Sequence, residues 1–95
     1  MIDLARYRSL YHTEAQRRLA EARAALECGD RGTVQRSFHT LRGMSLMLGF
    51  EEVGTRAGRL EEGLFRGELG EAELWSGLEE LEEAVLLLAS AGGGD

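Results

Sequence analysis

The sequence predicts an all-α fold, an antiparallel up-and-down four-helix bundle, and three observations lead to this expectation. Apolar residues recur at three- and four-residue steps in four separate stretches, the spacing that places them on one side of a helix. Proline is absent from all 95 residues, which favours long uninterrupted helices. The four stretches are joined by short connections, and short connections give antiparallel neighbours. No window shows the strict alternation of a β-strand.

The first helix is expected to run from about Asp3 to Glu27. Its predicted core stripe consists of Leu4, Tyr7, Tyr11, Ala15, Leu19, Ala22 and Leu26. The segment after Glu27 is predicted to end this helix, because Gly29 suits a left-handed C-cap and Asp30 suits the N-cap of the next helix.

Three further helices follow, each with its own apolar stripe. The stripes are Val34, Phe38, Leu41, Ser45 and Leu48; Val53, Ala57, Leu60 and Leu64; and Leu74, Leu78, Leu81, Val85 and Leu88. The second helix is expected to end at Gly49, the third at Gly67 and the fourth before residue 91. Residues 1–90 are therefore predicted to form one bundle domain. Residues 91–95 are glycine-rich, which is typical of a frayed tail or of the start of a flexible linker.

Composition and charge exclude several classes of function. A chain of 95 residues is long enough for one hydrophobic core. The net charge of −6 argues against a nucleic-acid-binding protein, which needs a basic surface. The single cysteine, Cys28, excludes an internal disulfide and a cysteine-based metal site. The longest apolar run is far shorter than the roughly 20 residues of a membrane span, and no signal peptide is recognisable. The sequence therefore predicts a cytoplasmic protein with no membrane or nucleic-acid partner.

The predicted second helix presents a histidine to solvent. With about 100° per residue, His39 lies about 140° from the centre of the core stripe, and Arg42, Gly43 and Leu46 share this solvent side. A histidine in such a position is usually no more than a solvated residue. Gly43, however, costs roughly 1 kcal/mol relative to alanine inside a helix, and close approach of another molecule's surface is one candidate reason for it. His12, the other histidine, has no second ligand at metal spacing and is predicted to lie on the surface.

The predicted third helix carries a line of small residues beside its core stripe. Gly54, Gly58, Glu61 and Phe65 follow one another at spacings of four, three and four residues. Small residues would let this helix lie close to the second helix, so that Glu61 reaches the imidazole of His39. A carboxylate bound to one ring nitrogen leaves the lone pair of the other nitrogen available for nucleophilic attack. An arginine one turn away suits phosphate oxygens. This pattern indicates a phosphoryl acceptor.

Residues 38–50, Phe-His-Thr-Leu-Arg-Gly-Met-Ser-Leu-Met-Leu-Gly-Phe, resemble the phosphoacceptor motif of histidine-containing phosphotransfer (HPt) domains. They are particularly similar to the N-terminal HPt domain of CheA-type chemotaxis histidine kinases, which reads H-[ST]-[LI]-K-G, then a short apolar run and G-[FY]. The similarity continues through residues 57–61 and, loosely, through residues 7–14, so that it covers about two-thirds of the chain.

The resemblance implies a role for each matching residue. His39 would accept the phosphoryl group, and Glu61 would hold the other ring nitrogen. Arg42 would stand in for the family's usual lysine beside the phosphate. Gly43 would give clearance for a partner, and the exposed patch of Gly43 with Leu46 would be the docking surface.

The resemblance also implies a phosphorelay function. No glycine-rich ATP-binding loop is present, so the chain is expected to be a phosphocarrier without enzyme activity of its own and without a bound cofactor or metal. A histidine-kinase catalytic domain, using ATP and Mg²⁺, would phosphorylate His39, and an aspartate of a response-regulator receiver domain would take the group. The alternative is a pseudo-HPt adaptor or dimerisation module in which His39 is idle. One departure is Gly58, where CheA-type domains often place a second histidine, and it implies a thinner hydrogen-bond network.

Overall fold

The computed structural model describes residues 3–93, with side chains described up to residue 88, and it confirms the predicted all-α fold. The helices are α1 (Leu4–Glu27), α2 (Arg31–Met47), α3 (Glu51–Arg66) and α4 (Glu71–Gly93). Residues 3–93 contain no strand. The last helix continues to Gly93, past the predicted boundary at residue 90, and Gly94 and Asp95 lie outside the described residues.

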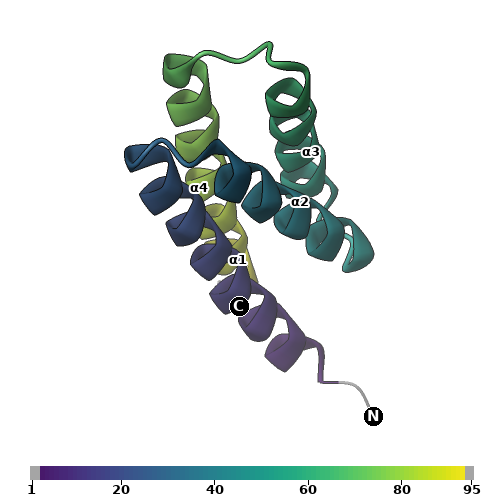
Figure 1. Cartoon of the computed structure of the whole chain (residues 1–95). Helices are drawn as coiled ribbons and strands as arrows, with labels where there is room; N and C mark the ends of the chain where they lie inside the picture. The colour runs from purple at the N-terminus through teal and green to yellow at the C-terminus, as the bar shows by residue number, and fades with distance from the viewer. Residues whose placement is uncertain (1–2, 94–95) are drawn as a thin grey trace.

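The helices form a ring in which successive helices run in opposite directions (Figure 1). α1 packs against α2 and α4, and α3 packs against the same two helices. The most extensive helix–helix contact is the one between α2 and α3. This pair carries the candidate site residues, so the site lies across the most extensive interface of the bundle.

Helix starts and ends follow the predicted capping residues. The Asp30 carboxylate accepts hydrogen bonds from the Thr33 backbone N–H at 3.2 Å and from the Thr33 hydroxyl at 2.7 Å. These bonds hold the pKa of Asp30 below its ordinary value, because they stabilise the ionised form. Gly29, Gly49 and Gly67 end the first three helices in the left-handed region, where a side chain would be strained.

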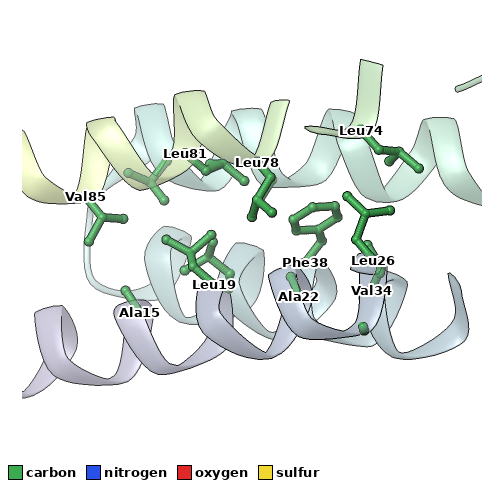
Figure 2. Packing of buried hydrophobic residues seen from close by; sticks show 14 of the residues in the cluster. Ala15, Leu19, Ala22, Leu26, Val34, Phe38, Leu74, Leu78, Leu81 and Val85 are labelled. Carbon is green, nitrogen blue, oxygen red and sulfur yellow. The ribbon is translucent and has the colours of Figure 1, made fainter. Parts of the chain in front are cut away.

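The core is a continuous cluster of side chains from all four helices (Figure 2). Its large members that are almost completely buried are Phe38, Leu41, Leu74, Leu78, Leu81, Val34, Val53 and Val85. The predicted stripes are correct in the middle of each helix. They are wrong at one end of the bundle, where Leu4 is 71% exposed, Tyr7 is 52% exposed and Leu48 is 42% exposed.

A buried polar contact between α1 and α2 shows why Leu4 and Tyr7 are exposed. The Tyr11 and Ser45 hydroxyls lie 2.7 Å apart, and the Tyr11 ring stacks on Phe50 with centroids 4.2 Å apart. Tyr11 thus meets the last turn of α2, so the part of α1 that precedes Tyr11 extends past the end of α2. Burial raises the pKa of Tyr11, while the hydrogen bond with Ser45 opposes that shift.

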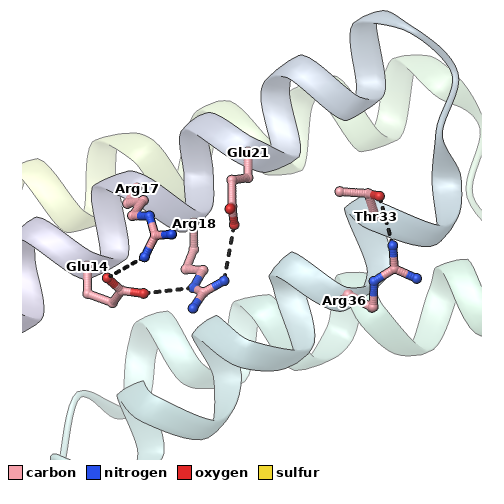
Figure 3. A network of polar contacts seen from close by, with 6 residues as sticks. All are labelled: Glu14, Arg17, Arg18, Glu21, Thr33 and Arg36. Atoms are coloured by element: carbon pink, nitrogen blue, oxygen red, sulfur yellow. Dashed lines mark hydrogen bonds and ion pairs between the residues drawn. The ribbon is translucent and has the colours of Figure 1, made fainter.

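Several ion pairs lie on the surface of the bundle. On α1, Arg18 bridges Glu14 and Glu21 at 2.9 and 3.2 Å (Figure 3). Such exposed pairs within one helix contribute only about 0.3–0.5 kcal/mol each. The ion pair between α1 and α4 is bidentate, because Arg23 donates two hydrogen bonds to Glu82, at 2.6 and 3.0 Å. These hydrogen bonds raise the pKa of Arg23.

Candidate functional site

His39 projects from the middle of α2 into solvent, and its side chain is 68% exposed. Its neighbours Phe38 and Leu41 are buried in the core, at 1% and 0% exposure. Because these apolar neighbours fix the inward face of α2, the helical period directs the imidazole outward. The prediction that this histidine faces solvent is confirmed.

Glu61 reaches His39 from α3, across the closest helix pair. Its Oε2 atom lies 2.6 Å from Nδ1 of the imidazole, a distance typical of a charge-assisted hydrogen bond. Only 16% of the Glu61 side chain is exposed, whereas the imidazole is mostly solvated. An ionised carboxylate can only accept, so Nδ1 is the donor, and in the neutral imidazole Nε2 then keeps its lone pair.

Arg42 lies one helical turn after His39 and contacts the same carboxylate. Its Nη1 atom is 3.6 Å from Oε1 of Glu61, which makes an ion pair but is too long for a good hydrogen bond. Each carboxylate oxygen therefore serves one partner: Oε2 faces His39, and Oε1 faces Arg42. The Arg42 side chain is 49% exposed, which leaves room for an anion beside the imidazole to approach it.

The other two predicted site residues lie on the same face of α2. Gly43 is exposed, and a Cβ atom at this position would meet nothing within 4 Å. Leu46 is 43% exposed, and its side chain lies over Gly54 of α3. A Cβ atom at Gly54 would lie 2.6 Å from Cδ2 of Leu46 and 3.3 Å from its backbone nitrogen. Gly54 is thus required for the close approach of α3 to α2, as the glycine line predicts.

An open groove of about 510 Å³ runs between α2 and α3 beside Arg42 and Glu61. Phe65 lies at its edge and is 78% exposed. Gly58 also lines this groove, directly beneath the side chain of Arg42. The sequence singled out Gly58 as part of the line of small residues and as the place of a missing histidine, but its contact with Arg42 was not predicted.

The remaining titratable groups of the described residues do not form a metal-binding cluster. Among the described residues, no three His, Cys, Asp or Glu side chains lie close enough together to hold a metal ion. His12 is not fully on the surface as predicted, because it is partly buried on α1 and its Nε2 atom has no hydrogen-bond partner within the described part of the chain. Within that same part, no helix has the length and apolarity needed to cross a membrane.

Comparison with known proteins identifies the family. The Hpt domain family model matches residues 6–91, a range that contains α2, α3 and all the site residues described above. No curated protein matches the chain, and no solved structure does. Hpt domains are phosphocarrier modules for histidine phosphotransfer in phosphorelays, and they are not catalysts themselves. Since the matched range spans nearly the whole chain and the structure is a four-helix bundle, this chain belongs to the Hpt domain family.

Proposed function

We propose that His39 is the phosphoacceptor of this Hpt domain. It receives a phosphoryl group from a histidine-kinase catalytic domain and passes it to an aspartate of a response-regulator receiver domain. The observation that carries this proposal is the 2.6 Å contact between His39 Nδ1 and Glu61. It leaves Nε2 as the nucleophilic atom on a side chain that projects into solvent, where two different partners can reach it.

The geometry supports in-line displacement at phosphorus. The Nε2 lone pair attacks the γ-phosphorus of ATP held by the kinase domain, the N–P bond forms, and the bond to the ADP oxygen breaks. In the neutral imidazole with Nδ1 as the donor, Nε2 carries no proton, so the attack needs no general base. The Nδ1 proton stays in its hydrogen bond with Glu61, which stabilises the positive charge that develops on the ring. In the second transfer, the aspartate oxygen attacks phosphorus and the N–P bond breaks.

Arg42 and the open face of α2 supply the rest of the function. The guanidinium lies beside Glu61 and is accessible to the phosphoryl oxygens, whose charge it offsets. Gly43 and Leu46 form the partner-docking surface, because the glycine leaves room for a close approach and the leucine offers exposed apolar area. ATP and Mg²⁺ belong to the kinase domain. The chain itself contributes the acceptor, its orientation and charge.

A labelling experiment tests the proposal. The chain is mixed with a CheA-type kinase core and labelled ATP, and it is expected to acquire an acid-labile, base-stable label typical of phosphohistidine. Addition of a receiver domain is then expected to remove the label from the chain. Absence of label with several active kinase cores would contradict the proposal and would favour the adaptor alternative, in which His39 is idle.

Replacing Glu61 by alanine is expected to slow phosphorylation of His39 by roughly 10–100-fold, the effect of losing one charge-assisted hydrogen bond. The fold is expected to remain intact, because Glu61 is not part of the hydrophobic core. Initial labelling rates measure the first effect, and circular dichroism measures the second. The matched control is Glu62→Ala, since Glu62 is 61% exposed and pairs only with Arg66 in the same helix. Equal rates for the two variants would show that the Glu61 carboxylate does not assist the imidazole.

A further inference from the structure

Gly58 on α3 lies directly beneath the side chain of Arg42. A Cβ atom at position 58 would lie 3.0 Å from Cδ of Arg42 and 3.1 Å from its Nε, and both distances are shorter than an ordinary carbon contact. The next nearest atom, at 3.7 Å, is Cγ of the same arginine. Arg42 therefore crosses α3 through the space that any side chain at position 58 would occupy.

We propose that Gly58 is a positioning residue for phosphotransfer: its missing side chain forms the seat in which Arg42 lies across α3, beside Glu61 and His39. This inference rests on the proposed function of His39. In this inference Gly58 affects phosphotransfer only by positioning Arg42.

The neighbouring glycine on α3 shows that Gly58 is not explained by helix packing. A Cβ atom at Gly54 would collide with the Leu46 side chain and crowd the Leu46 backbone nitrogen at 3.3 Å, so the absence of a side chain at Gly54 is what lets the two helices approach closely. The three nearest atoms at Gly58 all belong to the side chain of Arg42, and none is backbone. Because glycine is the poorest helix former after proline, its presence inside α3 requires some compensation. The position of Arg42 supplies it.

The space above Gly58 restricts the conformation of the Arg42 side chain. Arginine has many rotamers, and an arginine on a solvent face would otherwise sample most of them. Here the stem lies against α3, and Nη1 is held 3.6 Å from Oε1 of Glu61 while half of the side chain stays exposed. The cation is thus placed before the phosphoryl group arrives, which reduces the entropy lost when it binds the phosphoryl oxygens.

The test begins with Gly58→Ala in the full chain. Phosphorylation by the kinase core is expected to slow by roughly three- to tenfold, because Arg42 is displaced from its place beside Glu61. The melting temperature is expected to stay the same or rise, since alanine is the better helix former. The matched control is Gly32→Ala in α2, where a Cβ atom would make only ordinary contacts of 3.7 Å, with Arg36 and Asp30. This variant should keep the rate of the unsubstituted chain.

A double-mutant cycle separates a positioning role from a merely structural one. In an Arg42→Ala background, Gly58→Ala is expected to cause no further loss of rate. The same fractional loss in both backgrounds, or no loss in either, would overturn the inference. Nuclear Overhauser contacts between the Gly58 α-protons and the Arg42 δ-protons test the seat without any phosphorylation, and their absence would also overturn it. An unsubstituted chain that accepts no label would contradict the proposed function instead, so the two failures are distinguishable.

Discussion

Replacing His39 by glutamine is expected to abolish the phosphohistidine label completely. The glutamine amide nitrogen has no available lone pair, so it cannot attack phosphorus even in the same position. The fold is expected to be unchanged, because the imidazole is 68% exposed and makes its one hydrogen bond at the surface. Labelling with a CheA-type kinase core measures the loss, and circular dichroism checks the fold.

The other histidine provides the matched control for this experiment. His12 lies on α1, and its Nε2 atom is buried, so a kinase domain cannot reach it. His12→Gln is therefore expected to keep the label. Equal labelling of the His39→Gln variant and the unsubstituted chain, or loss of label only in His12→Gln, would contradict the assignment of His39.

Replacing Phe38 by alanine is expected to lower the free energy of unfolding by roughly 3–5 kcal/mol. Phe38 is 1% exposed and belongs to the core cluster that also contains Leu26 of α1 and Leu78 of α4 (Figure 2). Its removal loses apolar burial and leaves a cavity that the surrounding helices fill only in part. Equilibrium denaturation by guanidinium chloride measures the change.

Phe65 provides the control for the Phe38 variant. It is the same residue type on the adjacent helix, but it is 78% exposed at the edge of the groove. Phe65→Ala is therefore expected to change the free energy of unfolding by no more than about 0.5 kcal/mol. A loss for Phe38→Ala as small as the one expected for Phe65→Ala would contradict the prediction. Since a small domain is stable by only about 5–15 kcal/mol, the Phe38 variant is also expected to unfold at a much lower temperature.

The sequence by itself determined the helices and the outward face of α2. Its turn residues, Gly29, Gly49 and Gly67, mark helix ends that the structure reproduces. The solvent exposure of His39 and Arg42 followed from helical phase alone. These features are local, because capping and the 3.6-residue period depend on neighbours within one or two turns.

Only the tertiary structure decided how α2 and α3 meet. The relative position of α2 and α3 depends on how Leu46 packs over Gly54 of the facing helix. That of α1 and α2 depends on the contact between the hydroxyls of Tyr11 and Ser45, two residues that are distant in sequence. The exposure of Tyr7 at the start of α1 was mispredicted for the same reason, since helical period cannot tell where a neighbouring helix ends.

The site shows the same division between local and long-range information. The glycine line of α3 predicted that Glu61 would approach His39, and the structure gives that approach as a contact of 2.6 Å. The sequence did not predict that the Arg42 side chain lies over Gly58, because a glycine shows only that a side chain is absent. The space left by a missing side chain has a function only when a neighbouring helix places another residue in it. Which residue fills that space depends on how the helices pack in the bundle.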